Sequence, residues 1–392
     1  MDKYLGLKCN NEKSGIYPAL SRRFLGYEFY KQKNSKKIYV RRYENKNRYC
    51  YRKWNTSAIQ KIDRNYHLVN DGILTRKDYT ILFENEEGKN YIPVETCGSI
   101  NVYSNVIFSS SFFEYAKIKG LIVNIYGKYG EYVGTFHTST HGETSRMILK
   151  QAQIYNDIIG RVEMAEKIER ASLHNQRENL RYYYKRKKNE KLKSAIDCLT
   201  VCIEKMKICK SINELTLLEA RAKQIYLQCF DSMIDNEEFI FDKRTRRPPR
   251  NEVNALISFG NVFIYQRIAT EIRKTALDIR IGFVHATNNR SETLNLDIAE
   301  IFKPIIVDRA IFTIIHNMQI SRKEHFERDE DGAVFLNKIG KKIFIRELEK
   351  KLYQKIKIDG ISRTYDWIIR NEIQKIVHVV KDGEKYKPYK YT

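Results

Sequence analysis

Residues 146–209 have the sequence "RMILKQAQIYNDIIGRVEMAEKIERASLHNQRENLRYYYKRKKNEKLKSAIDCLTVCIEKMKIC". The stretch contains no proline, and its apolar residues recur at the three- and four-residue spacing of an amphipathic α-helix. A helical pattern continues over most of the chain that follows, up to a polar tail at residues 386–392. We therefore predict that residues 141–385 form an all-α domain.

The preceding segment, residues 66–140, has a different pattern. Short runs such as "YTILFEN", "SINVYS" and "GLIVNIYG" have the composition of β-strands and are separated by Gly- and Asn-rich turns. A single short helix, "SSFFEYAKIKG", is predicted to begin at a serine cap and to end at Gly120. The chain is thus predicted to be α+β, with a small, mostly antiparallel sheet domain followed by a larger helical domain.

The chain is strongly basic. Its 71 Lys and Arg residues against 48 Asp and Glu residues give a net charge of +23, and residues 1–65 alone carry 17 basic and 5 acidic side chains. A surplus of this size is typical of proteins that bind a polyanion such as nucleic acid. The Tyr-rich residues 1–65 are either a solvated, partly disordered arm or an extension that grips a nucleic-acid backbone.

Several classes of protein are disfavoured. The longest uncharged run, residues 97–113, is too short and too polar to span a bilayer, and the first residues lack an apolar signal core. Seven cysteines without disulfide-like spacing fit a reducing compartment, so we expect a cytoplasmic protein. The GxxxxGK[ST], GxSxG and HExxH motifs are absent, which argues against P-loop, serine-hydrolase and zinc-protease chemistry.

Two basic clusters lie in the helical region. Residues 181–193 hold seven basic residues and one acid beside three tyrosines, and residues 243–250, "KRTRRPPR", form a proline-broken loop with five basic residues. A charge run is often only a solvated face, but two clusters in so basic a chain favour contact with nucleic acid. The candidate DNA-binding residues are Arg181, Lys185, Arg186, Lys187, Lys188, Arg244, Arg246, Arg247 and Arg250.

A carboxylate is misplaced in residues 211–230, "SINELTLLEARAKQIYLQCF". Ser211 and Glu214 form a capping box at the predicted helix start. On a helical wheel, Glu219 lies within about 40° of Leu215, inside the apolar stripe. A buried carboxylate is costly unless it is paired or binds a metal. Glu219 is therefore predicted either to pair with an arginine of another helix or to be a metal ligand.

The same anomaly recurs in residues 282–304, "GFVHATNNRSETLNLDIAEIFKP". Asp297 lies on an apolar helical stripe, Glu300 lies at its margin, and His285 precedes the helix across a polar loop. Asp308 lies about 16 Å further along the axis and is expected to pair with a basic side chain. Glu, His and Asp together suit a divalent cation such as Mg²⁺ or Mn²⁺.

These motifs resemble a known family, the CRISPR-associated integrases that acquire new spacers. The resemblance rests on "NDGILTRKDYTILFE", "HNQRENLR", "LLEARAKQIY", "RRPPRNEVNALISFGN", "GFVHATNNRSETLNLDIAEIFKPIIVDR" and "HFERDEDGAVFLN", which occur in the family's order and extend from residue 66 to the C-terminus. It implies a β-sandwich-like N-terminal domain that dimerises and an α-helical catalytic domain. Residues 1–65 fall outside it.

The resemblance also implies the site and the reaction. In the family a Glu, a His and an Asp bind the catalytic Mg²⁺ or Mn²⁺, and the matching residues are Glu219, His285 and Asp297. Glu300 occupies a second acidic position of the same motif. The 3′-hydroxyl of a short DNA fragment would attack a phosphodiester at the leader–repeat boundary of a CRISPR array. His285 is either a ligand or an acid–base group.

The resemblance implies the partners as well. They are double-stranded DNA, a second copy of the chain, and a small ferredoxin-like CRISPR adaptation subunit with which the homodimer forms a heterohexamer. Two alternatives stay open, namely a structure-selective nuclease that cleaves branched DNA in repair and a non-catalytic scaffold that only holds DNA.

Overall fold

The computed structural model describes residues 23–24, 27–31, 38–42, 64–138, 144–285 and 291–391. The chain divides into two compact units, Met1–Lys61 and Ile62–Thr392. In the first unit, β1 (Arg23–Phe24), β2 (Tyr27–Lys31) and β3 (Ile38–Arg42) form an antiparallel sheet in the order β1-β2-β3. The alternatives for residues 1–65 stay open, because most of these residues lie outside the described ones.

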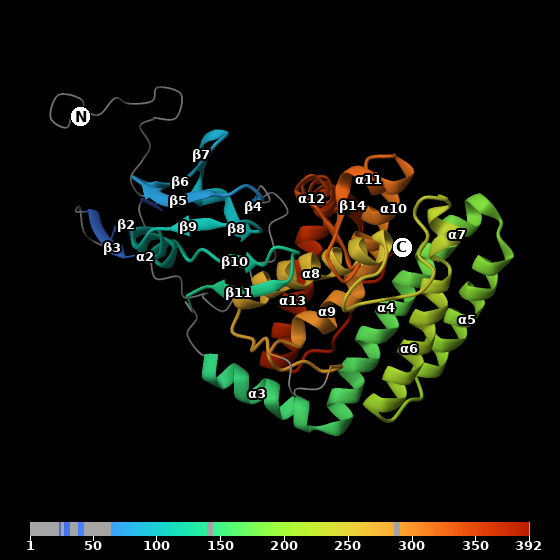
Figure 1. Ribbon diagram of the computed structural model, residues 1–392. Helices are drawn as coiled ribbons and strands as arrows, with labels where there is room; N and C mark the ends of the chain where they lie inside the picture. Colours follow the sequence, from blue (N-terminus) through green and yellow to red (C-terminus); the bar gives the residue numbers. More distant parts are fainter. Residues whose placement is uncertain are drawn as a thin grey trace. The chain divides into compact units, whose positions relative to one another are not determined.

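The second unit begins with two four-stranded sheets (Figure 1). One has the order β11-β10-β8-β4 and the other the order β7-β6-β5-β9. Their strands are β4 (Arg64–Leu68), β5 (Gly72–Lys77), β6 (Thr80–Asn85), β7 (Gly88–Ile92), β8 (Cys97–Val102), β9 (Val106–Phe108), β10 (Val123–Tyr126) and β11 (Tyr132–Phe136), with a 3-10 turn, η2 (Val94–Thr96), before β8.

The prediction of a mostly antiparallel sheet is wrong. The pairs β4–β8, β8–β10 and β5–β9 are parallel, and the other three pairs in these sheets are antiparallel. Alternation in the sequence predicts that a strand forms but not which strand it pairs with, and here β4 and β5, adjacent in the chain, join different sheets. A shared core that includes Leu74, Ile81, Ile100 and Val123 is fully buried.

The predicted short helix of this region is confirmed as α2 (Ser110–Lys119). The Ser109 hydroxyl accepts a hydrogen bond from the Phe112 backbone N–H at 3.3 Å, which caps the first turn. Gly120 ends the helix with a φ of 64°, a left-handed conformation that glycine adopts without steric cost.

Helices dominate the rest of the unit, as predicted. They are α3 (Thr144–Asn156), α4 (Ile158–Lys187), α5 (Glu190–Met206), α6 (Ile212–Gln228), α7 (Phe230–Ile234), α8 (Glu252–Arg273), α9 (Leu294–Lys303), the π-turn η3 (Pro304–Asp308), α10 (Arg309–His316), α11 (Arg322–His325), α12 (Lys338–Tyr353) and α13 (Tyr365–Asp382). None of the helices in the described ranges is long and apolar enough to cross a membrane.

Two short hairpins interrupt the helices, so this region is not purely helical. Strands β12 (Phe326–Arg328) and β13 (Val334–Leu336) form one antiparallel hairpin, and β14 (Lys355–Ile358) and β15 (Ile361–Thr364) form the other. The second hairpin turns at Asp359 and Gly360, both with positive φ. The prediction of an all-α domain misses both hairpins, because their strands are only three or four residues long.

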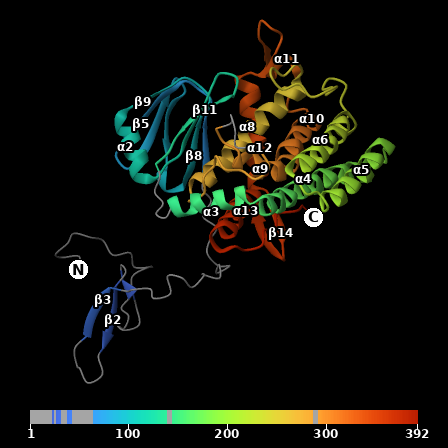
Figure 2. The same cartoon turned by 90° about the horizontal axis from the view of Figure 1, so that it is seen from below.

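Helices α4, α5 and α6 lie side by side in both views of the molecule (Figure 2). The continuous helical pattern of residues 146–209 breaks at two polar caps. The Asp157 carboxylate accepts the backbone N–H groups of Ile159 and Gly160, which starts α4. Asn189 caps α5 in the same way through Lys191 and Leu192.

Helix α4 supports the helix that carries Asp297 and Glu300. Pro304 interrupts that helix, and the chain continues into α10 through the π-turn η3. The buried side chain of Asn175 donates to the Ile301 carbonyl at 2.8 Å, and that of Asn179 donates to the Pro304 carbonyl at 2.6 Å. Pro304 has no backbone N–H to donate, so the helical hydrogen-bond pattern is interrupted there. The side-chain amides of Asn175 and Asn179 donate to carbonyl oxygens at this interruption. The motif "HNQREN", residues 174–179, therefore holds the irregular turn that follows Asp297 and Glu300.

Asp308 closes the π-turn and differs from its prediction. Its Oδ2 accepts a hydrogen bond from the Tyr226 hydroxyl at 2.8 Å, where a basic partner was expected. Burial raises the pKa of Asp308 to about 7. A carboxyl group with such a pKa is partly protonated at neutral pH, which reduces the need for a basic partner.

Candidate active site

A cleft of about 1600 Å³ lies among the helices of the second unit. Its walls come from α4, α6, α8 and α9, from the loop after α7 that contains Arg246 and Arg247, and from the β10–β11 turn. Three of the four predicted metal-site residues line it, namely Glu219, His285 and Glu300. The cleft therefore joins side chains that are far apart in the sequence.

Helix α6 positions Glu219. Ser211 caps the helix, because its hydroxyl accepts the Glu214 N–H at 3.2 Å, and the Glu214 carboxylate accepts the Lys210 N–H at 2.9 Å. Two turns later, Oε1 of Glu219 lies 3.0 Å from Nζ of Lys223, on the same helix. The expected alternative of an arginine from another helix is not what pairs with Glu219 in the structure.

Glu300 shares the ammonium group of Lys223. Its Oε2 lies 3.1 Å from Nζ of Lys223, and its Oε1 pairs with Lys303. Burial would raise the pKa of Glu300, but the charges of Lys223 and Lys303 lower it below the ordinary value. Burial likewise disfavours the charge of Lys223, yet Glu300 and Glu219 raise its pKa. A positive charge is thus already held between these two carboxylates.

Asp297 holds His285 in place. Its Oδ1 accepts a hydrogen bond from Nδ1 of His285 at 2.7 Å and from the His285 backbone N–H at 3.0 Å. Its Oδ2 accepts the backbone N–H groups of Phe283 and Val284. Asp297 is fully buried, and these four bonds fill the acceptor capacity of a carboxylate. The carboxylate therefore faces the turn, and Nε2 is the ring nitrogen that can bind a cation or exchange a proton.

Gly282 makes this close approach possible. A Cβ atom added there would lie 2.7 Å from Oδ2 of Asp297 and 3.0 Å from the Thr293 hydroxyl. The Thr293 hydroxyl itself accepts the Gly282 N–H at 2.9 Å and donates to the Arg280 carbonyl at 2.7 Å. The turn before His285 is consequently fixed on both sides.

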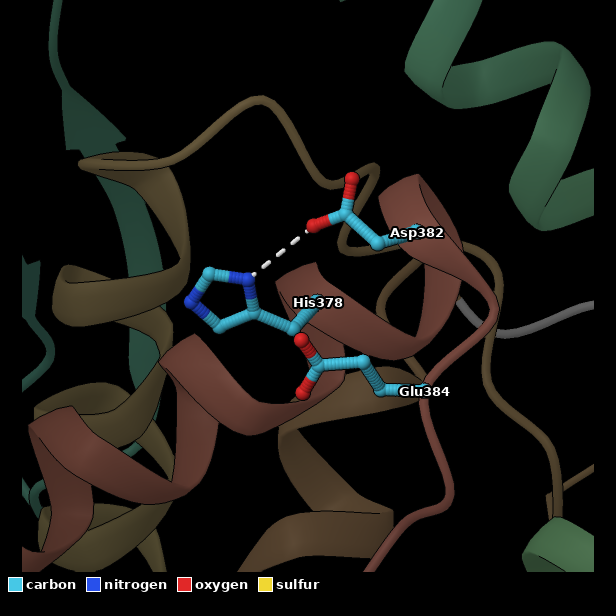
Figure 3. Close-up of side chains that lie close together, drawn as sticks. All are labelled: His378, Asp382 and Glu384. Carbon is cyan, nitrogen blue, oxygen red and sulfur yellow. Dashed lines mark hydrogen bonds and ion pairs between the residues drawn. The ribbon is translucent and has the colours of Figure 1, made fainter. Parts of the chain in front are cut away.

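The predicted set Glu219, His285 and Asp297 does not converge on one point within the part of the chain that the structure describes. In that part, the only group of three ligand-type side chains whose atoms all lie within 4.8 Å of one another is His378, Asp382 and Glu384, at the end of α13 (Figure 3). Nδ1 of His378 lies 3.2 Å from Oδ2 of Asp382. Asp382 and Glu384 are exposed, and none of the three lines the cleft.

Sequence reasoning missed Glu169 of α4, which also lines the cleft. Its side chain is buried, and burial, followed by the charges of Glu219 and Glu300, raises its pKa well above the ordinary value. The signal was present, since Glu169 shares a helical face with Ala165 and Leu173. The helical-wheel argument that marked Glu219 would have marked Glu169 too.

The two basic clusters differ. Arg246 and Arg247 are exposed and line the cleft, together with the more buried Arg244. Arg244 is a structural residue, because it donates to Oδ1 of Asn254 at 2.8 Å and to the Ser258 hydroxyl at 3.0 Å. Burial lowers the pKa of Arg244 to about 10. Arg250, the last arginine of this loop, donates to the carbonyl of Asp331, which lies between β12 and β13.

The cluster of residues 181–188 ends α4 and does not line the cleft in the described structure. Arg181 pairs with Glu178 at 2.8 Å, and the Arg186 guanidinium lies 3.5 Å from the ring centre of Tyr182. Lys187 donates to the Ser232 carbonyl at 3.0 Å, and Lys188 adopts a left-handed φ of 50° as the helix cap. Lys185 is exposed. Part of this cluster thus terminates the helix.

The family described as "CRISPR associated protein Cas1" matches residues 66–350. The chain belongs to the Cas1 family. The "CRISPR-associated endonuclease Cas1 2" of Thermodesulfovibrio yellowstonii is 40% identical over 328 residues, which are 83% of this chain and 98% of that protein. The Cas1 endonuclease of Thermotoga maritima is 36% identical over 312 residues, 79% of this chain and 94% of that protein.

Solved structures agree with this assignment. A Cas1 protein from Thermotoga maritima is 33% identical and superposes with a TM-score of 0.73 over 84% of this chain and 100% of its own. A casposase bound to its integration product also has a TM-score of 0.73, over 84% of this chain and 94% of its own; at 18% identity it shares the fold. The predicted family and the predicted α+β fold class are therefore confirmed. Residues 1–65 precede the region matched to Cas1.

Proposed function

We propose that this Cas1 protein is a Mg²⁺- or Mn²⁺-dependent DNA integrase and endonuclease, which inserts short foreign DNA fragments into a CRISPR array. The observation that carries the proposal is the cleft, which is lined by Glu219, His285 and Glu300 together with the exposed Arg246 and Arg247. Carboxylate and imidazole ligands suit a divalent cation, and exposed arginines suit a phosphate backbone.

The residues present fit a divalent cation. Glu219 and Glu300 already hold one positive charge, the Lys223 ammonium, at 3.0 and 3.1 Å. Glu219, Glu300 and Nε2 of His285 would hold the metal, while Asp297 positions His285. When bound, Mg²⁺ or Mn²⁺ polarises a phosphodiester and stabilises the negative charge that develops during in-line attack. The ligand role predicted for Asp297 stays a prediction, and the four hydrogen bonds of its carboxylate favour the positioning role.

His285 has two roles open to it, and Asp297 serves both. Because an ionised carboxylate can only accept, Nδ1 of His285 is the donor to Asp297, and in the neutral imidazole Nε2 then carries the lone pair. That lone pair can bind the metal or take a proton from the attacking 3′-hydroxyl. The fixed turn at Gly282 limits the freedom of the ring in either case.

The basic clusters would bind double-stranded DNA. Arg246 and Arg247 at the cleft would contact the strand that reacts, and the exposed Lys185, Arg186 and Lys188 would contact DNA outside it. Arg181, Lys187, Arg244 and Arg250, also predicted as contacts, each have a partner within the protein, so we assign them a supporting role.

The proposed partners follow the family. A solved "Cas6-RT-Cas1--Cas2 complex" contains a chain that shares this fold with a TM-score of 0.73 at 20% identity. We propose that the present protein forms a homodimer through its sheet domain. The homodimer would join a small ferredoxin-like subunit of the Cas2 type in a heterohexamer that holds the DNA fragment.

A strand-transfer assay tests this function. The purified chain, the small subunit, a short duplex and a leader–repeat target are incubated with Mn²⁺ or with EDTA. Metal-dependent joining of fragment to target is expected. Metal-dependent hydrolysis of branched DNA without joining would favour the structure-selective nuclease, and binding without either reaction would favour the scaffold.

A further inference from the structure

Glu169 occupies an unusual position on α4. The residue is 1% exposed, and its neighbours in the chain, Ile168 and Ala171, are fully buried core residues. Its Oε2 atom is buried and has no hydrogen-bond partner among the described residues. A buried polar atom without a partner costs free energy on the order of 1–3 kcal/mol. Some compensating interaction is therefore expected at this carboxylate.

Other side chains that line the same cleft also have unpaired oxygens. Four cleft-lining side chains have a buried oxygen without a partner in the described ranges: Glu169, Gln176, Gln266 and Asn295. All four atoms are hydrogen-bond acceptors. Buried acceptor oxygens without a partner are suited to a cation or to the water that surrounds it.

The charged side chains around Glu169 are paired with one another, and Glu169 has no ion pair within the described ranges. The Asp297 carboxylate is satisfied by three backbone N–H groups and by His285. Lys303 pairs with Glu300, and Lys223 bridges Glu300 and Glu219. No ion pair joins Glu169 to a cation within the described ranges, although the charges of Glu219, Glu300 and Lys223 act on it. Among Glu169, Glu219, Glu300 and Asp297, Glu169 alone has no ion pair within the described ranges.

We infer that Glu169, which lines the cleft from α4, is a further carboxylate ligand of the divalent cation in this cleft. The inference rests on the proposed metal site and extends it by one residue. An oxygen donor of this kind favours hard cations such as Mg²⁺ and Mn²⁺ over softer ones. If the Glu169 side chain only filled space, an uncharged amide of the same size would leave the affinity for Mn²⁺ unchanged. A measurement of that affinity therefore distinguishes a ligand from a packing residue.

Mn²⁺ binding to the full chain tests the inference, measured by calorimetry and by the loss of the free Mn²⁺ signal in electron paramagnetic resonance. Glu169→Gln should weaken Mn²⁺ binding by about tenfold or more. Glu163→Gln is the matched control, because Glu163 lies on the same helix but is exposed and pairs with Lys167 at 2.6 Å. Glu163→Gln should bind Mn²⁺ as the wild type does.

Thermal unfolding separates a ligand from a structural residue. Without added metal, Glu169→Gln should unfold at a temperature no lower than the wild type, and the increase in Tm caused by Mn²⁺ should be smaller. Glu169→Asp, which keeps the charge, should recover part of the affinity. Wild-type affinity in Glu169→Gln would overturn the inference alone. A wild-type chain that binds no Mn²⁺ would overturn the proposed metal site and the inference with it.

Discussion

Nδ1 of His285 donates a hydrogen bond to Oδ1 of Asp297 over 2.7 Å, and the Asp297 side chain has no exposed surface. The carboxylate also accepts three backbone N–H groups from the turn that carries His285. These four hydrogen bonds favour a role for Asp297 in positioning the turn and the His285 ring. Asp297 therefore holds the His285 ring in place, and its predicted role as a metal ligand stays a prediction.

The first prediction concerns this pair. Asp297→Asn should reduce strand transfer by at least about 10²-fold, because an amide nitrogen would face N–H donors and the His285 ring would lose its fixed tautomer. The free energy of unfolding should fall by about 1–3 kcal/mol. Asp278→Asn is the control, since Asp278 is buried in the same loop and pairs with Arg280 outside the cleft. Equal losses of activity in the two variants would contradict the positioning role.

The second prediction concerns DNA. Replacing Arg246 and Arg247 by alanine should weaken binding of duplex DNA and reduce the slope of log K against log salt by about 2, because each lost phosphate contact removes about 0.9. Fluorescence anisotropy over a range of salt concentrations measures the slope. Lys77→Ala with Lys89→Ala, two exposed lysines on the sheets, is the control and should leave it unchanged. An unchanged slope in the arginine variant would exclude the cleft rim as a DNA contact.

The third prediction concerns Lys223, whose ammonium lies between Glu219 and Glu300. Lys223→Met should raise the affinity for Mn²⁺ about tenfold, because removing a unit charge about 4 Å away changes the free energy by on the order of 1 kcal/mol or more. Calorimetric titration checks the change. Arg221→Met, an exposed residue of the same helix, should show no increase. Weaker Mn²⁺ binding in Lys223→Met would mean that the ammonium supports the metal site.

The sequence predicts several residues of this site but not the side chains with which they pair. Glu219 and Asp297 were recognisable because each is a carboxylate on an apolar helical stripe. The partner of each was not predictable. Lys223 of α6 pairs with Glu219 and also with Glu300 of α9. Asp297 accepts a hydrogen bond from His285, in the loop that precedes its own helix. Such contacts depend on tertiary packing, which a single-helix wheel does not include. The parallel strand pairs were missed for the same reason.

The fourth prediction concerns pH. Burial raises the pKa of Asp308 from 3.8 to about 7 in the folded chain. The folded state thus keeps a proton that the unfolded chain releases, so the contribution to stability is complete below about pH 4 and is lost as the pH rises to 7. Asp308→Asn removes this titration and can still accept from Tyr226. The Tm of the variant relative to the wild type should therefore rise between pH 4.5 and 8, and parallel curves would contradict the assignment.

The fifth prediction tests the central claim, that the cleft performs metal-dependent phosphodiester chemistry on DNA. The measurement is the rate of strand transfer by Glu219→Gln and by Glu214→Gln, in the presence of Mn²⁺ and the small subunit. Glu214 lies on the same helix and caps it, a role that glutamine can retain. Glu219→Gln should abolish joining while DNA binding persists, and Glu214→Gln should join at the wild-type rate. Wild-type joining by Glu219→Gln would contradict the account.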